Sequence, residues 1–265
     1  EQSRNAQLEE NKTQLRNSVH SIRILSESKL KRLKEDTRDD VFYRVQEAID
    51  IAYQIYANNP DKDQETVKKL IRDALRSIRF NRGSGYYFIG GVNEKTLEMY
   101  PPQPELEQQK FSILGEPWIS LTDKLEEQVR TYNDGFIEYL WPKLGTTNEP
   151  HKKITYVKLF SPFNWYIGAG LYLDDQVQVI KEQILEDIRI LNQEVSSYIL
   201  LTQQRRLLVG DDASHVANFE LLEANRFHQV GKMLYYAETI LPLGWTLGRT
   251  FDLTPLEEEI ARRQV

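Results

Sequence analysis

Residues 152–175, KKITYVKLFSPFNWYIGAGLYLDD, decide the fold of this chain. Aromatic and β-branched residues dominate two runs, 153–160 and 165–173, as is typical of β-strands. Pro162 and the small residue before Trp165 favour a turn between the two runs. The stretch therefore predicts two antiparallel strands joined by a tight turn.

The same hairpin recurs in KMLYYAETILPLGWTLGRT, residues 232–250. Four positions keep their spacing in the two copies: Tyr156, Pro162, Trp165 and Gly168 in the first, and Tyr236, Pro242, Trp245 and Gly248 in the second. Each copy is followed by a helical pattern. The repeat therefore predicts the closing strands of two tandem, related sheets.

The rest of the chain is helical at its start and mixed thereafter. Residues 3–58 contain neither Gly nor Pro, and their apolar residues recur at helical spacing, so a helix of ~80 Å is expected. The predicted α+β organisation is a long N-terminal helix at 1–60, a first module at 61–175, a connecting helix at 176–196, a smaller second module at 197–254 and an exit helix at 255–265.

The composition excludes several classes of protein. With 34 basic and 40 acidic side chains among 265 residues, the net charge is −6 and a nucleic-acid partner is not expected. The absence of cysteine rules out disulfides, thiolate zinc sites and cysteine nucleophiles. No apolar run approaches the ~20 residues that cross a bilayer. Because both ends of the sequence have helical patterns, we expect a fragment cut within continuing helices.

Signatures of catalysis are absent from the sequence. The four histidines are scattered, without the i,i+4 pair of a helical metal site. The Gly-Ser-Gly at 83–85 precedes a strand and is not followed by Lys and Ser or Thr, so it is not a phosphate-binding loop. We therefore predict that the fragment is not an enzyme and holds no cofactor and no metal.

Four separated motifs between residues 82 and 175 carry a family resemblance. They are RGSGYYFIGG (82–91), YPPQPELEQQKF (100–111), GFIEYLWPK (135–143) and the hairpin motif at 152–175. In this order they resemble the Cache family of extracytoplasmic sensor domains. The sequence departs from the family pattern at Tyr100, where histidine is frequent, and at 106–111, where the family favours Leu-Glu-Gly-Lys-Asn. Both departures lie beside the expected pocket.

The resemblance implies a double Cache fold, in which a long helix precedes two tandem PAS-like antiparallel sheets. Such domains lie outside the membrane in bacterial and archaeal receptors, including sensor histidine kinases, chemoreceptors and diguanylate cyclases. The module at 61–175 would be membrane-distal and bind ligand, and the module at 197–254 would be membrane-proximal. The second module lacks the first two motifs, so its assignment rests on the hairpin alone.

These expectations imply a cellular location and partners for the fragment. It would be the periplasmic, ligand-sensing part of a receptor of the cell inner membrane, anchored by transmembrane helices outside the fragment and acting in signal transduction such as a two-component system. Ligand binding would shift the connecting and exit helices. The long helix, with its balanced charges, predicts a weak homodimer.

The candidate ligand site is an aromatic cup in the first module, with the loop 100–105 as one wall. Aromatic side chains supply apolar area and hydroxyl donors, and a lysine supplies a counter-charge for a carboxylate. The predicted ligand-binding residues are Tyr87, Tyr100, Trp118, Tyr139, Trp141, Tyr156 and Lys158. Lys143, Lys152 and Lys158 on adjoining strands favour a small anionic or zwitterionic ligand, such as a carboxylate or an amino acid.

Other interpretations remain open at this point. The same tyrosines and tryptophans also fit core positions, and the lysines fit a solvated strand edge. Asp174 and Asp175 fit either a cation or amine site or the first turn of a helix. The whole fragment could also recognise a periplasmic partner protein without a small ligand, or be a soluble solute-binding or structural protein.

Overall fold

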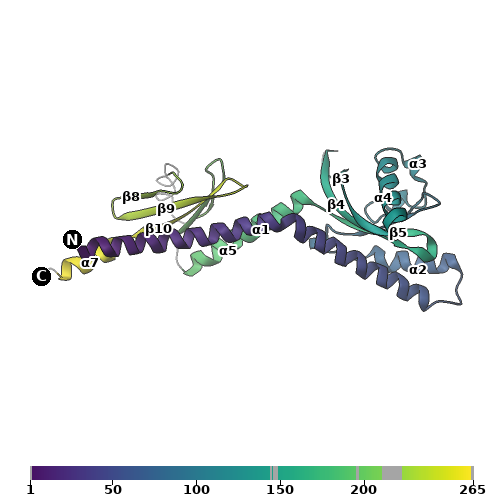
Figure 1. Cartoon of the computed structure of the whole chain (residues 1–265), viewed down its shortest axis with the longest axis horizontal. Coiled ribbons are helices and arrows are strands. Elements are labelled where there is room, and N and C mark those ends of the chain that lie inside the picture. The colour runs from purple at the N-terminus through teal and green to yellow at the C-terminus, as the bar shows by residue number, and fades with distance from the viewer. Residues whose placement is uncertain (1, 144, 146–148, 195–196, 211–222, 264–265) are drawn as a thin grey trace. The chain divides into compact units, whose positions relative to one another are not determined.

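The computed structural model describes residues 2–143, 145, 149–194, 197–210 and 223–263 (Figure 1). Residues 195 and 196 of the predicted connecting helix, and His215, lie outside the described residues. The helices are α1 (Gln2–Ala57), α2 (Gln64–Arg76), α3 (Phe111–Leu114), α4 (Trp118–Tyr132), α5 (Leu173–Glu194) and α7 (Thr254–Arg263). The strands are β1 (Tyr87–Gly91), β2 (Leu97–Met99), β3 (Asp134–Pro142), β4 (Pro150–Phe160), β5 (Trp165–Tyr172), β6 (Tyr198–Leu201), β7 (Leu207–Val209), β8 (Phe227–Val230), β9 (Met233–Ile240) and β10 (Trp245–Asp252).

The chain forms two compact units, and α1 contributes to both. One unit consists of Leu33–Val177, and the other combines Glu1–Arg32 with Gln178–Val265. Each unit contains one five-stranded antiparallel sheet. The strand order is β2-β1-β5-β4-β3 in the first sheet and β7-β6-β10-β9-β8 in the second, which is the same order. The predicted α+β fold, a long helix followed by two related antiparallel sheets, is confirmed.

The two hairpins of the repeat also share their register. Tyr156 pairs with Ala169 in the first hairpin, and Tyr236 pairs with Arg249 at the equivalent place in the second. The second sheet moreover has a counterpart of β1 and β2 that its sequence did not reveal. The β1–β2 pair shifts register after Ile89, and the β6–β7 pair shifts register after Leu200. The two modules are therefore related over the whole sheet.

In the unit Leu33–Val177, helices cover both faces of the sheet (Figure 1). The helix α2 begins at an N-cap, because the Asp63 side chain accepts hydrogen bonds from the backbone N–H and the hydroxyl of Thr66, at 2.9 and 2.6 Å. Its buried residues Val67, Ile71 and Leu75 recur every four positions and pack, together with α1, on one face of the sheet. The opposite face packs against α3 and α4.

In the other unit, the first half of α1 packs on the second sheet. Leu15 and Val19 belong to the apolar core beneath β6, β9 and β10. The buried carboxylate of Glu238 in β9 lies 3.0 Å from both His20 Nδ1 and Arg23 Nε of α1. Near the ends of the chain, Arg4 Nη2 lies 3.7 Å from Glu257 Oε1, so the start of α1 lies beside α7. None of the described helices is both long enough and apolar enough to cross a membrane.

Replacing Ile71 by Ala should destabilise the unit Leu33–Val177 strongly. Ile71 is 0% exposed between α2 and the sheet, and an Ile→Ala change at such a site costs about 2–5 kcal/mol of unfolding free energy. Ile113→Ala is the matched control in the same unit, because Ile113 is 72% exposed. Urea denaturation measures both. Equal losses of stability in the two variants would contradict the packing described here.

Candidate ligand-binding site

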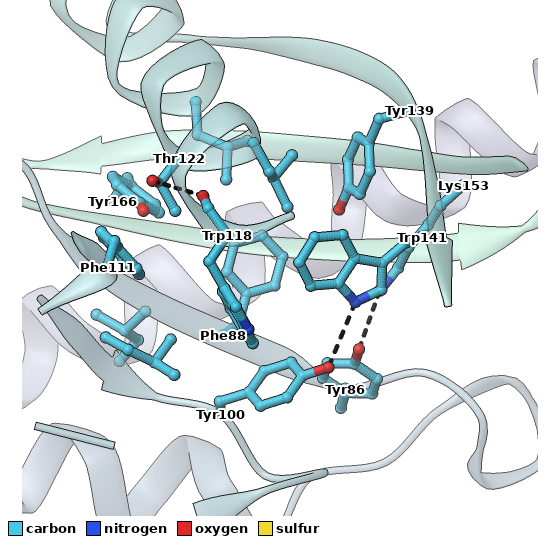
Figure 2. A pocket seen from close by; sticks show the side chains of 14 residues that line it. Tyr86, Phe88, Tyr100, Phe111, Trp118, Thr122, Tyr139, Trp141, Lys153 and Tyr166 are labelled. Carbon is cyan, nitrogen blue, oxygen red and sulfur yellow. Dashed lines mark hydrogen bonds between the residues drawn. The ribbon is translucent and has the colours of Figure 1, made fainter. Parts of the chain in front are cut away.

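The sheet face covered by α3 and α4 holds a narrow cavity (Figure 2). Its volume is about 20 Å³, so the side chains around it lie close together. Its lining is aromatic apart from a few aliphatic and two polar side chains. The aromatic residues are Tyr86, Phe88, Tyr100, Phe111, Trp118, Tyr139, Trp141 and Tyr166, and the polar ones are Thr122 and Lys153.

Lys153 is the charged residue among the described side chains that line this cavity, and it points inward from β4. It is 2% exposed, and its ammonium Nζ donates a hydrogen bond to Tyr86 Oη at 3.0 Å. The same nitrogen lies 4.7 Å from the centre of the Tyr86 ring and 5.1 Å from that of Tyr172, within the range of cation–π contacts. Among the residues that the structure describes, no carboxylate lies within ion-pair distance of Lys153.

Glycines of β5 make room for these side chains. A Cβ atom at Gly170 would overlap Thr155 Oγ1 and lie 2.8 Å from Lys153 Cε. A Cβ atom at Gly168 would overlap the ring of Phe88. The glycines of the hairpin motif are therefore required by close approach, because only a residue without a side chain lets the lysine and the ring lie across the strand.

The phenol groups around Lys153 stay neutral and act as hydrogen-bonding groups. Burial raises the pKa of Tyr86 to about 12, and it also raises the pKa values of Tyr100 and Tyr139. Tyr139 Oη lies 2.8 Å from Thr155 Oγ1. Trp141 Nε1 donates a long hydrogen bond of 3.5 Å to Tyr100 Oη. The cavity thus presents one cation and several neutral hydroxyls.

The backbone of Tyr100 is held by the carboxylate of Glu107, which also forms an ion pair with Arg76 of α2. Glu107 accepts two hydrogen bonds from the guanidinium of Arg76, at 2.6 and 2.7 Å. Oε1 of the same carboxylate accepts a hydrogen bond from the backbone N–H of Tyr100 at 2.7 Å. The hydrogen bond to Glu107 also raises the pKa of Arg76.

Trp118 covers the cavity from the first residue of α4. Its ring meets those of Tyr100 and Trp141 edge to face, at centroid distances of 4.9 and 5.0 Å. It also stacks on Phe111 of α3 at 6.4 Å. The cover of the cavity is therefore made by aromatic contacts rather than by hydrogen bonds, and such contacts can rearrange around a ligand.

The structure divides the seven predicted ligand-binding residues between the two faces of the sheet. Tyr100, Trp118, Tyr139 and Trp141 line the cavity. Tyr87, Tyr156 and Lys158 lie on the opposite face, and their assignment to the same cup is corrected here. Tyr87 is part of the core under α1 and α2, Tyr156 Oη donates to Asp134 at 2.6 Å, and Lys158 Nζ donates to Gln46 of α1 at 3.0 Å.

The reason for this correction is the register of the β3–β4 hairpin. Phe136 pairs with Tyr156, whereas Tyr139 pairs with Lys153. Since residues that pair across antiparallel strands point to the same face, Lys153 shares the face of Tyr139 and Tyr156 does not. The sequence did not give this register. Sequence patterns miss Lys153 for that reason, although alternation within β4 places Lys153 on one face as soon as one paired residue is known. They miss Tyr86 because the choice between the two faces of β1 depends on the pairing of β1 with β5.

The other charged residues named from the sequence are paired outside the cavity. Lys143 Nζ donates to Asp174 and Asp175, at 2.8 and 2.7 Å, and these two carboxylates stand in the first turn of α5. Lys152 Nζ lies 3.3 Å from Glu138 Oε2. Within the described ranges, no cluster of three or more His, Asp or Glu residues suits a metal ion.

Comparisons with known proteins agree on the class of domain. The profile of the Cache domain family dCache_2 matches residues 1–209. The methyl-accepting chemotaxis protein McpP of Pseudomonas putida is 30% identical over 113 residues, which are 42% of this chain and 20% of that protein. The sensor histidine kinase MctS of Rhizobium johnstonii is 26% identical over 131 residues, 47% of this chain and 26% of that protein. The chain thus spans about a quarter or less of the curated relatives it matches.

Similar solved structures include a Cache chemosensory domain described in terms of carboxylic acid recognition. It is 27% identical, with a TM-score of 0.46, and the match covers 54% of this chain and 97% of that one. The sensory domain of the Campylobacter jejuni chemoreceptor Tlp3 with isoleucine bound is 15% identical, with a TM-score of 0.36, and the match covers 93% and 96% of the two chains.

The raised pKa of Tyr86 predicts a loss of stability at high pH. Between pH 10 and 12 the unfolded state loses the Tyr86 proton, whereas the folded state keeps it until about pH 12. The folded state then binds more protons, so the free energy of unfolding falls as pH rises. Tyr86→Phe removes this contribution, and we expect its stability to fall less steeply between pH 10 and 11.5 in urea titrations.

Tyr132→Phe is the control for this experiment, because the Tyr132 side chain is 66% exposed and lies outside the cavity. Its slope should equal that of the unmodified chain. If Tyr86→Phe has the same slope as well, the burial of the Tyr86 hydroxyl is contradicted.

Proposed function

This chain belongs to the dCache_2 family of Cache domains, and we propose that its first module binds a small monocarboxylate through the ammonium group of Lys153. The chain is thus a Cache ligand-binding sensor domain, and the proposal concerns its ligand. One observation carries it: Lys153 is a buried cation in a cavity where no described carboxylate pairs with it.

The electrostatics of Lys153 favour an anionic ligand. A buried charge is costly unless an opposite charge or several hydrogen bonds compensate it. Tyr86 accepts one hydrogen bond, and the rings of Tyr86 and Tyr172 supply a partial cation–π attraction. An ammonium group has three N–H donors, so donors remain for a carboxylate without displacing Tyr86. The charge-assisted hydrogen bond would be the strongest contact in the cavity.

The remaining lining selects against a second charge on the ligand. Among the described residues, no acidic side chain lines the cavity, so an amino group of an amino acid would be buried without a partner. The walls opposite Lys153 are aromatic and aliphatic and suit a methyl or short alkyl chain. The proposed ligand class is therefore a short-chain monocarboxylate such as acetate or propionate.

The size of such a ligand limits its affinity. Acetate has four heavy atoms and can gain at most ~6 kcal/mol at the best ligand efficiency, which corresponds to a dissociation constant no tighter than about 40 μM. The space between the side chains is small, so a ligand must also displace part of the aromatic cover around Trp118. We therefore expect dissociation constants from tens of micromolar upward.

Binding at Lys153 has a direct connection to α5. Lys153 pairs across the strands with Tyr172, and Tyr172 immediately precedes the first residue of α5. Tyr172 Oη in turn donates to the carbonyl of Pro142 at 3.0 Å. We propose that a ligand on Lys153 changes its contact with the Tyr172 ring and so biases the position of α5. A ligand achieves this only if it binds the two positions with different affinities.

In the whole protein, this module would work as the extracytoplasmic part of an inner-membrane receptor. Flanking transmembrane helices, a homodimer through α1 and a cytoplasmic output of the chemotaxis or histidine-kinase kind belong to this proposal. The chain itself spans 20% and 26% of the two relatives with such names. Recognition of a periplasmic protein without a small ligand is the alternative outcome of the experiment below.

Lys153→Met should weaken carboxylate binding strongly. Calorimetric titration with propionate should give measurable binding to the unmodified chain and a loss of more than ~2 kcal/mol, about thirtyfold in affinity, in the variant. Lys152→Met is the matched control, because the neighbouring Lys152 side chain is 53% exposed and paired with Glu138 outside the cavity. If Lys152→Met loses binding and Lys153→Met keeps it, the assignment of Lys153 is wrong.

The same substitution should leave the free domain at least as stable as before. A buried cation without an ionic partner is replaced by an apolar side chain of similar length, which is often neutral or stabilising. Without ligand, the midpoint of thermal unfolding of Lys153→Met should equal or exceed that of the unmodified chain, whereas saturating propionate should raise only the latter. A strongly destabilised Lys153→Met variant would indicate a structural lysine. Absence of binding by any short carboxylate to the unmodified chain would favour the partner-protein alternative.

A further inference from the structure

A second, larger cavity adjoins the first on the side of Tyr86 and Tyr100. The volume of this outer cavity is about 370 Å³, whereas that of the first, inner cavity around Lys153 is about 20 Å³. Of the residues that the structure describes, Tyr86 and Tyr100 line both cavities. Arg79, Gly83 and Ser84 of the outer cavity are exposed, whereas none of the described residues lining the inner cavity is. The outer cavity therefore lies between the inner cavity and the solvent.

We propose that the outer cavity is the path by which a ligand reaches Lys153, and that the side chains of Tyr86 and Tyr100 form the barrier across it. This inference rests on the carboxylate site proposed above and adds how that site is reached and how the length of its ligand is limited.

The barrier consists of two tyrosine rings whose hydroxyl groups accept hydrogen bonds. The rings of Tyr86 and Tyr100 meet edge to face at 5.8 Å, with an interplanar angle of 81° (Figure 2). The hydroxyl of Tyr86 is held by Lys153 and that of Tyr100 by Trp141. The second of these hydrogen bonds is 3.5 Å long and hence weak, so it adds little resistance to a turn of the Tyr100 ring. Turning either ring aside joins the two cavities.

Two other sides of the inner cavity, towards the sheet and towards the body of α4, are closed by packed structure. The sheet forms its floor, with Phe88 and Tyr166, and α4 covers it with Leu121 and Leu125, all four buried. A ligand arriving there would have to separate a helix from the sheet. Displacing a single aromatic ring requires less rearrangement, so the tyrosine side, which adjoins the outer cavity, is an easier path than the sheet or α4.

The rim of the outer cavity carries a cation that suits an anionic ligand. Arg79 Nη1 donates to the carbonyls of Arg76 and Ile78, at 2.7 and 3.0 Å, and among the described residues it has no carboxylate partner. Burial raises the pKa of Tyr86 and the positive charge of Arg79 lowers it, so Arg79 lies near the barrier. Lys143 of the same rim is instead held by Asp174 and Asp175. Arg79 is therefore the group that attracts a carboxylate to the barrier.

The experiment compares two substitutions of Ser84, whose side chain lies in the outer cavity and not in the inner one. Ser84→Phe fills the outer cavity, while Ser84→Ala loses the same hydrogen bonds to Asn81 without filling it. Propionate binding is followed by stopped-flow fluorescence, because Trp118 and Trp141 line the inner cavity. We expect Ser84→Phe to slow association and dissociation alike by about tenfold, which corresponds to ~1.4 kcal/mol in each barrier, and to leave the dissociation constant unchanged.

Rates in Ser84→Phe that equal those of Ser84→Ala would overturn the inference. So would a change in the dissociation constant alone, because the outer cavity would then hold part of the bound ligand. If the unmodified chain binds no carboxylate at all, the proposed function fails. If it binds propionate but the rates do not respond to Ser84→Phe, only the path fails.

A second variant tests the barrier itself. Tyr100→Ala opens the inner cavity to the outer one, so the longest linear carboxylate that binds should grow from propionate towards hexanoate, with faster association. Tyr100→Phe keeps the ring and loses only the weak hydrogen bond from Trp141, so it should keep the original chain-length preference. The same chain-length preference in Tyr100→Ala, with binding of propionate retained, would exclude Tyr100 as the barrier.

Discussion

The structure of the first module depends on a sheet that is buried on both faces. Residues 153–157 of β4 are all buried, because α1 and α2 pack on one face and α3 and α4 on the other. In such a sheet every strand position can be apolar, and a charged side chain has no solvent on either face to reach. Lys153 therefore cannot be an ordinary strand lysine. Its position obliges the surrounding side chains to compensate a charge, which they do in part through Tyr86 and the aromatic rings.

The same double burial explains which parts of the site could be predicted from the sequence. Alternation within single strands was predictable: Tyr86 and Phe88 do share one face, and Tyr139 and Trp141 do share one face. What alternation does not give is which face of one strand matches which face of the next. That depends on the hairpin register, here Tyr139 opposite Lys153, and no polar face marked it. Alternation alone therefore assigns Tyr156 and Lys158 to the cup and favours the exposed Lys152 over its neighbour Lys153.

The fold itself is easier to predict, because the hairpin motif that indicates it occurs twice in the sequence. Turn residues and the spacing of Trp165 and Trp245 fix the strand pairing in both copies, and the pairing registers agree. The first two strands of the second sheet carry no such signal. Leu200 and Leu201 replace Ile89 and Gly90 at the register shift, so the backbone feature is kept while the residue types differ. Sheet geometry tolerates this change, since a shift in register is a property of the backbone pairing rather than of one side chain.

In the proposed function, the contacts of Lys153 would also connect access, binding and transmission. In the structure its ammonium is held by Tyr86, which together with Tyr100 separates the inner from the outer cavity, and it faces the ring of Tyr172 beside the start of α5. A carboxylate that takes a share of this ammonium weakens its attraction to both rings at once, because the positive charge is then neutralised. In the proposed function, the ring at the barrier and the ring before α5 would thus respond to the same event. Such a site would need no separate sensor for occupancy, since the charge proposed to bind the ligand is also the charge that holds the surrounding rings in place.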